Sequence, residues 1–470
     1  MLRPRLLAIK RVLQDSNLHA VPETVTSGSA RSFWLWILIL FLSFLGCTYY
    51  LLYLQTTYIR QPVLATTATQ AQTKLPLPRL ALSRFQRFNR ESLEREFQVF
   101  SVHADALSGS SNQFPDNKTE AYKLFVAALS ILFVPLGTLT YGDKAKSVEE
   151  HSANDWSSDT LSLGVNSVLR KMGGQDQVIL RTTFKCEDLV IACKLESGPW
   201  REDCCQTYKD GHFFDPNGLW HILNFGDQMS LNYEAGIKLS LSYNSSLTEP
   251  DEIGSEKNAG FTLILYHLDT GIEVQNQVLI PAGVNAIVQV TERRFSYVNK
   301  PGSPCVSSRS SPLFATKIGC IMGCMTEKLT EICNCRPLFG INDTASESLQ
   351  LNYDPCDPRK SFHCLNKTST KRYNEDIALC NSKCHRNCDY VSYKTLLSYV
   401  TNSEASVTNV LIRHGSLHTE VVKEYFVMPT QAFAANFGGV LGLWLGCSIL
   451  TLFHLVFYGV SAICFGKKPQ

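Results

Sequence analysis

The sequence lacks charge along one stretch near its end, and it lacks the short motifs of the common enzyme classes. No Asp, Glu, Lys or Arg occurs between Val440 and Phe465, and a run of that length can cross a bilayer as a helix. The net charge of +2 gives no reason to expect nucleic acid as a partner. There is no Walker loop, no HExxH and no G-x-S-x-G elbow. We therefore expect a membrane protein without catalytic residues or a cofactor.

A second apolar run, from Phe33 to Leu54, follows a basic N-terminal segment. It is too long and too far from the start for a signal peptide, so it predicts a first membrane helix. Basic residues flank the outer ends of both runs, which predicts that both termini are cytoplasmic. The expected plasma-membrane topology has these parts: cytoplasmic 1–32, first span 33–54, extracellular 55–429, pre-pore segment and second, pore-lining span 430–466, and cytoplasmic 467–470.

Two further patterns agree with an extracellular loop. Of the 17 cysteines, all but Cys47, Cys447 and Cys464 fall between residues 55 and 429. An even number in an oxidising compartment predicts up to seven disulfides. Four glycosylation sequons fall in the same region, at Asn117, Asn244, Asn342 and Asn366.

The loop combines strands with a cysteine-rich block. Alternating apolar residues predict strands at 236–243, 260–267 and 285–292, and another at 415–427 that leads towards the second span. Residues 111–185 predict only irregular or helical structure. Cys186, Cys193, Cys204 and Cys205 predict two local disulfides whose pairing stays open.

Ten cysteines lie between residues 305 and 388. Cys320 and Cys324, and likewise Cys380, Cys384 and Cys388, have the i, i+4 spacing that lines one helix face. Two such rows facing each other would form a ladder of disulfides. A zinc site is the competing interpretation, but extracellular thiols oxidise and the CxxC pairs of structural zinc sites are absent. We therefore expect no metal.

The second apolar run carries features beyond an anchor. Gly438, Gly442 and Gly446 share one helix face, where small residues let helices approach closely. Cys447 and Ser448 follow Gly446, and an unwound backbone at that depth requires a water-filled path. His454 lies two turns further on, and a titratable group at that depth indicates a functional site.

Several separated motifs resemble the epithelial sodium channel, degenerin and acid-sensing channel family, with details most like its invertebrate pickpocket-type members. Residues 436–451, NFGGVLGLWLGCSILT, are similar to the family's D-x-G-G…G-L-x-x-G-x-S-x-L-T signature. The spacings Cys320-x3-Cys324-x8-Cys333-x-Cys335, Cys356-x7-Cys364 and Cys384-x3-Cys388 match its thumb cysteines.

The resemblance implies an α+β membrane protein with two membrane helices, a palm-like central sheet and a cysteine-braced thumb at 305–388. It implies a homo- or heterotrimer that passes Na⁺ and is of the amiloride-sensitive type. Carried over by position, it assigns Gly446, Cys447, Ser448 and His454 to the selectivity filter and pore, and His19, Ala435, Asn436, Gly438, Gly439 and Gly442 to gating. It also implies a nested pairing, Cys305–Cys388, Cys320–Cys384, Cys324–Cys380, Cys333–Cys364 and Cys335–Cys356.

The sequence departs from the family at three places. The cytoplasmic His-Gly motif is His19-Ala20, which removes the residue with backbone freedom. Both cysteines of one family disulfide are replaced together, by Ser83 and Trp220. His454 and Phe457 occupy positions of pore carboxylates, so a symmetric trimer would lack those negative rings.

Three functions remain open on the sequence. The first is a cation channel subunit, and the second is a regulatory subunit that needs a partner to supply pore carboxylates. The third is a membrane-tethered receptor whose disulfide-braced ectodomain binds an extracellular ligand. Membrane lipid is a partner in each case.

Overall fold

In the computed structural model the chain forms two compact units. The first unit comprises residues 1–66 and 424–470, and the second comprises Thr67–Lys423. The described residues are 14, 20–108, 117–133, 159–196, 198–215, 218–226, 229–230, 236–249, 259–267, 270–272, 276–300, 302–307, 316–338, 353–358, 370–446, 448, 450, 453 and 456–457.

The first unit contains the helices α2 (Val21–Thr26), α3 (Ala30–Arg60) and α15 (Thr430–Leu445). The helix α3 contains the whole first apolar run and extends beyond it at both ends. It begins where the Ser29 side chain accepts a hydrogen bond from the Ser32 N–H, and it ends at Gln61, which has a left-handed conformation. Among the described residues, α3 is one helix long and apolar enough to span a membrane.

The described residues cover only part of the second predicted span. Val440–Phe465 was expected to cross the bilayer as a helix, with a locally unwound backbone considered at Gly446–Ser448, and α15 ends at Leu445, where Gly446 adopts a left-handed conformation with φ 64°. Glycine pays no Cβ penalty there, so this residue can end a helix that apolar composition alone would continue. The described part of the chain therefore contains no second helix long enough to span.

The second unit is built around a six-stranded sheet. Its strands lie in the order β14 (Asp389–Thr401), β11 (Val284–Ser296), β15 (Val407–Phe426), β8 (Gly236–Ser242) and β4 (Val190–Leu195), and β1 (Val63–Ala71) also pairs with β15. The alternation in β8 and β11 puts every second side chain into the core. The parallel pairing of β11 with β15 shifts register between Val290 and Glu292, where β15 carries an irregular insertion.

A second sheet of five antiparallel strands was not foreseen, since one central sheet was expected. Its order is β10 (Gln277–Pro281), β9 (Gly260–Tyr266), β3 (Arg79–Arg84), β6 (Gly218–Leu223) and β5 (Lys209–Asp215). Side chains of both sheets join one hydrophobic core, which includes Leu82, Phe261, Val288 and Ile412. Two short pairs add to the structure: β2 (Leu75–Pro76) with β7 (Met229–Ser230), and β12 (Cys305–Val306) with β13 (Arg386–Asn387).

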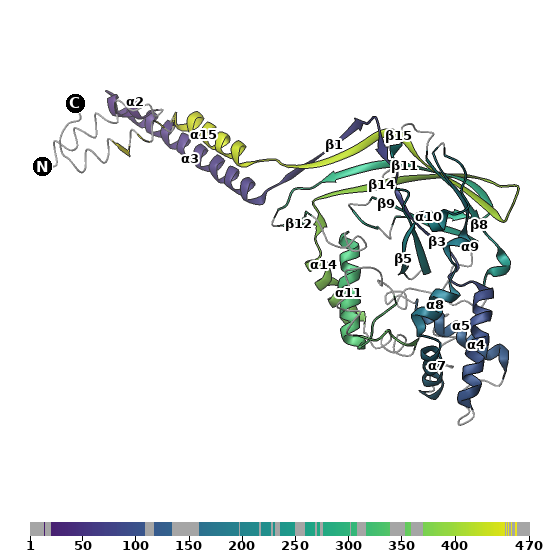
Figure 1. Ribbon diagram of the computed structural model, residues 1–470. Helices are drawn as coiled ribbons and strands as arrows, with labels where there is room; N and C mark the ends of the chain where they lie inside the picture. Colours follow the sequence, from purple (N-terminus) through teal and green to yellow (C-terminus); the bar gives the residue numbers. More distant parts are fainter. Residues whose placement is uncertain are drawn as a thin grey trace. The chain divides into compact units, whose positions relative to one another are not determined.

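A helical group occupies part of the region for which the sequence predicted little. It consists of α4 (Arg90–Ser108), α5 (Lys118–Ile131), α7 (Asp159–Lys171) and α8 (Gln175–Thr182), which lie together in Figure 1, and the single turn η2 (Ser245–Leu247) contacts α4. These helices share a core of their own that includes Phe100, Phe125, Leu129 and Val168.

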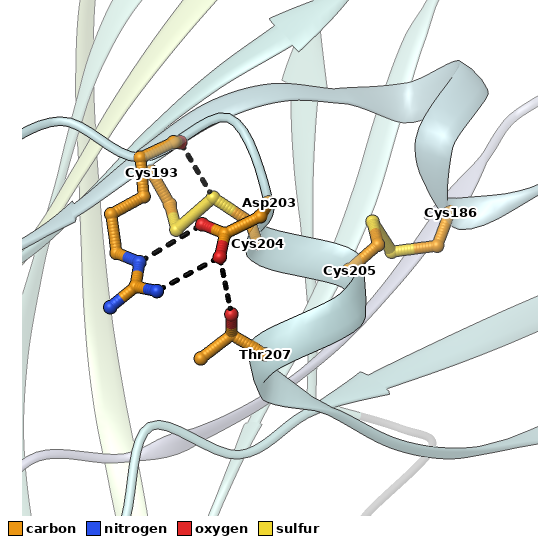
Figure 2. Close-up of a disulfide and its surroundings, with 7 residues drawn as sticks. Cys186, Cys193, Asp203, Cys204, Cys205 and Thr207 are labelled. Atoms are coloured by element: carbon orange, nitrogen blue, oxygen red, sulfur yellow. Dashed lines mark hydrogen bonds and ion pairs between the residues drawn. A yellow bond between two sulfur atoms is a disulfide. The ribbon is translucent and has the colours of Figure 1, made fainter.

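The first cysteine cluster forms two nested bonds beside the short helices α9 (Cys186–Leu189) and α10 (Cys204–Tyr208). Cys186 pairs with Cys205, and Cys193 pairs with Cys204 (Figure 2). Asp203, which precedes α10, accepts hydrogen bonds from the Arg201 guanidinium at 2.9 and 2.8 Å. The structure thus selects one of the pairings that the sequence left open.

The second cysteine block holds α11 (Lys317–Cys333) against α14 (Thr370–Lys383), as Figure 1 shows. The bonds are Cys305–Cys388, Cys320–Cys384, Cys324–Cys380 and Cys335–Cys356, four pairs that the resemblance implied. Cys333 is also disulfide-bonded, and its expected partner Cys364 lies outside the described residues. The predicted helical row was wrong for Cys384 and Cys388, because α14 ends at Lys383.

Ser83 and Trp220, which replace the missing family disulfide, lie on the neighbouring strands β3 and β6. Ser83 follows Leu82 and Trp220 precedes His221, and Leu82 and His221 are paired across the two strands. The Ser83 hydroxyl donates to the Leu219 carbonyl at 2.9 Å, and the fully buried Trp220 stacks on Phe213 at 5.7 Å between ring centroids. A hydrogen bond and aromatic packing therefore stand where the covalent link would be.

Candidate pore segment

Two antiparallel helices, α3 and α15, pack along the length of α15. Near the start of α15, Tyr58 and Phe433 lie 4.5 Å apart between ring centroids. Near its end, the Trp444 indole lies 5.8 Å from the Tyr50 ring and directly over Gly46. These aromatic contacts at both ends fix which face of α15 is turned to α3.

The opposite face of α15 carries the residues assigned to gating. Ala435, Asn436, Gly438 and Gly439 are exposed within this single chain. A Cβ placed on Gly438 or Gly439 would meet no atom within 4 Å. This face therefore has room for another helix to approach closely.

The helix ends at the first residue of the predicted filter. The Gly446 N–H bonds back to the Gly442 carbonyl at 3.0 Å, and Gly446 itself has the left-handed conformation that ends α15. An ended helix leaves carbonyl oxygens without intrahelical partners, and within a membrane such groups need protein or water. A backbone of this kind can present carbonyls to a cation.

Several predicted residues lie outside the described part of the chain, namely His19, Cys447 and His454, together with the sequons Asn342 and Asn366. Ser448 follows the break and Phe457 is 67% exposed. Ala20, next to His19, has φ 65° and precedes α2. That left-handed conformation is one that glycine adopts at lower cost, so Ala20 occupies it under strain.

No carboxylate or other charged group lies on α15. No cluster of three or more His, Cys, Asp or Glu side chains able to hold a metal occurs within the described ranges. If this segment binds an ion, its backbone and hydroxyl oxygens must supply the contacts.

A buried histidine lies on β15, the strand that precedes α15 in the chain. Its Nε2 lies 3.0 Å from the Pro76 carbonyl, which can only accept, so this nitrogen carries the proton. Burial lowers the pKa of His414, while the Pro76 carbonyl and Glu292 act in the opposite direction. The ring is therefore neutral at pH 7.

The contact of Gly46 with Trp444 was missed by sequence reasoning. The signals were present, since Gly46 is a lone glycine inside the first apolar run and Trp444 is a large residue within the pore signature. Nothing in either local pattern relates the two positions, because the register of α3 against α15 is a tertiary property.

Comparisons with known proteins identify the family of this chain. The family model described as amiloride-sensitive sodium channel matches residues 12–458. Human acid-sensing ion channel 2 is 24% identical over 247 residues, which cover 50% of this chain and 43% of the relative. The rat bile acid-sensitive ion channel is 20% identical over 287 residues, covering 54% and 56%. Zebrafish acid-sensing ion channel 1B is 22% identical over 339 residues, covering 62% and 56%.

The chain thus spans about half the length of the curated relatives it matches. A solved proton-activated chloride channel aligns over 92% of this chain and 97% of its own, with a TM-score of 0.31 and 6% identity, which is too low to carry an argument. The family model covers nearly the whole sequence, including the signature around the helix break, and its members are channels rather than enzymes. The chain belongs to the amiloride-sensitive sodium channel family.

Proposed function

We propose that this chain is a subunit of a trimeric, sodium-preferring cation channel in the plasma membrane, with invertebrate pickpocket-like sequence details. Na⁺ passes the helix break at Gly446, with Cys447 and Ser448 as the filter and His454 deeper in the pore. Both termini are cytoplasmic, residues 55–429 are extracellular, and 430–466 complete the second crossing. The observation that carries this proposal is the break of α15 at the first filter residue of a matched channel family.

The exposed face of α15 supports assembly with further copies or related chains. Ala435, Asn436 and the two following glycines are open to solvent in a single chain, although they lie in an apolar helix. An apolar helix face of small residues is suited to close packing against a second helix. In a trimer, three such faces would surround one axis.

Enlarging Ala435 tests the proposal. We expect whole-cell recordings of the full chain with Ala435→Phe to show an inward Na⁺ current that amiloride blocks, because the larger side chain keeps neighbouring α15 helices apart. The unmodified chain and uninjected cells are the controls, and surface biotinylation confirms delivery. Protein at the surface without any current contradicts a self-sufficient pore.

A regulatory subunit is the second candidate, because Phe457 and His454 stand where the family carries carboxylates. Such a chain would need a partner to attract cations into the pore. Current that arises only when this chain is co-expressed with a conducting relative, and that differs from the relative's own current, favours this second candidate.

A further inference from the structure

Gly46 forms a notch in α3 that holds the indole ring of Trp444. A Cβ built on Gly46 would lie 2.5, 2.7 and 2.8 Å from the Cζ3, Cη2 and Cε3 atoms of that ring. Real Cβ atoms do not approach ring carbons so closely, so any larger residue at position 46 must displace the indole. Gly46 has no Cβ, and the indole of Trp444 fills the space that a side chain would take.

The walls of the notch restrict where the indole can go. Tyr50, one helical turn further along α3, lies 5.8 Å from Trp444 between ring centroids with the planes 31° apart. Cys47, next to the notch, is only 3% exposed, so this is among the most tightly covered positions of α3. Helix pairs in a membrane depend on this kind of packing, since apolar burial alone does not favour protein over lipid.

Trp444 lies two residues before the break that ends α15. The Gly446 N–H bonds to Gly442 and Leu441 carbonyls, so Trp444 belongs to the helical turn that the break closes. Moving α15 by one residue relative to α3 would shift it by about 1.5 Å and rotate it by about 100°. Either movement would take the indole out of the notch.

We infer that Gly46 is a positioning residue for ion selection, because it holds Trp444 and thereby fixes the depth and rotation of the break at Gly446. This inference rests on the proposed function, and it gives the first membrane helix a role beyond anchoring. Gly46 acts through Trp444 and need not touch the ion.

The experiment compares Gly46→Ala, Trp444→Leu and the double substitution in the full chain carrying Ala435→Phe. Two quantities are measured for each variant: the ratio of Na⁺ to K⁺ permeability from reversal potentials, and the melting temperature of the detergent-purified protein. Gly28→Ala is the matched control, since a Cβ there meets no atom within 4 Å. The permeability ratio does not depend on expression level, so a loss of stability alone would leave it unchanged.

We expect Gly46→Ala to change the permeability ratio by about threefold or more and to lower the melting temperature, as substitutions at touching residues do. Trp444→Leu in the same chain makes room for the new methyl group and returns both quantities towards the parent values. If Gly46→Ala does not reach the surface, recovery of surface protein in the double variant supports the packing of Trp444 into the Gly46 notch, and continued loss of surface protein overturns it.

Additive effects of the two substitutions, or an unchanged permeability ratio in Gly46→Ala, would falsify the inference. Failure of the proposed function has a different signature, because the parent itself then carries no current. The melting temperatures still decide the inference in that case. If the change in the double variant differs from the sum of the two single changes, the packing of Trp444 into the Gly46 notch is supported, and if it equals that sum, the inference is overturned.

Discussion

At the scale of single residues, His221 is a buried base whose surroundings oppose protonation. Its ring is 2% exposed, its Nε2 donates to the Phe184 carbonyl at 2.9 Å, and its Nδ1 has no partner among the described residues. Burial, the largest cause, lowers the pKa of His221 to about 4, and nearby positive groups act in the same direction. The folded protein therefore holds this imidazole neutral well below the pH at which an exposed one is charged.

The sign of the resulting pH dependence follows from proton binding. Above about pH 6.5 the ring is neutral in both the folded and unfolded chains, so it adds no pH dependence. Between that value and about pH 4 the unfolded chain binds a proton that the folded chain does not, so the free energy of unfolding falls as the pH falls.

We expect His221→Gln, which keeps a donor for Phe184, to reduce the loss of melting temperature between pH 7 and 5. The exposed His418→Gln is the control, and an equal effect there contradicts the prediction.

Trp220 provides a second prediction at this scale, since it fills the place of a family cysteine. It is 0% exposed, so Trp220→Ala leaves a large cavity and should cost about 3–5 kcal/mol of unfolding free energy. Ser83→Ala, which removes one buried hydrogen bond, should cost about 1 kcal/mol. Trp200→Ala is a matched control because that ring is 52% exposed. Equal melting temperatures for the Trp200 and Trp220 variants would show that packing does not replace the disulfide.

At the scale of helices and strands, Gly446 decides where α15 ends. Its φ of 64° costs an L-residue with a Cβ about 1–2 kcal/mol, so Gly446→Ala favours a continued helix over the break. We expect the Ala435→Phe channel with this substitution to lose its preference for Na⁺ over K⁺. Gly28→Ala is the comparison, because a Cβ there meets no atom within 4 Å and the residue lies outside α15. Retained selectivity in Gly446→Ala would argue against a filter at the break.

The helices α11 and α14 depend on their two cross-links. Replacing both Cys324 and Cys380 with Ser should lower the free energy of unfolding by at most about 2–5 kcal/mol, because the Cys320–Cys384 bond still joins the two helices. Cys324→Ser alone should be at least as harmful, since it leaves the fully buried Cys380 thiol unpaired. Melting curves with non-reducing peptide mapping measure both effects. A double variant as stable as the parent would mean that packing alone holds these helices together.

The elements differ in how far the sequence predicted them. The strands β8, β9 and β11 followed from two-residue alternation, and α3 followed from an uninterrupted apolar run, because these patterns are local. An unwound backbone at Gly446–Ser448 was considered from the small and polar side chains there, and the left-handed Gly446 ends α15 at that place, although apolar composition alone would not show it. Cys384 was placed on a helix by spacing alone, although α14 stops one residue earlier. The five-stranded sheet and the Gly46 notch depend on long-range packing, which no local pattern encodes.

At the scale of the whole molecule, a strand follows α3 and another strand precedes α15, each within a few residues. The strand β1 starts at Val63 shortly after α3, and β15 ends at Phe426 shortly before α15. The Val427 N–H donates to the Pro62 carbonyl at 2.9 Å, which ties these two links together, and β1 pairs with β15. This hydrogen bond, which lies within the first unit, holds the end of α3 and the segment before α15 close together.

The proposed topology makes its own prediction through the two sequons that the structure describes. Asn117 and Asn244 are exposed, and each uses its side-chain oxygen to accept a backbone N–H two residues on, at 3.0 Å, which leaves the amide nitrogen out of these two bonds. If residues 55–429 are extracellular, both nitrogens should carry glycans, and Asn117→Gln and Asn244→Gln should each remove one glycosidase-sensitive step in gel mobility. If both ends are cytoplasmic, as proposed, an epitope tag at either terminus should bind antibody only after the cells are permeabilised. Tags stained on intact cells would contradict that orientation, and surface protein whose mobility is unchanged by glycosidase would contradict an extracellular loop. Since glycosylation and tag access are independent of ion conduction, the topology can be decided before any current is recorded.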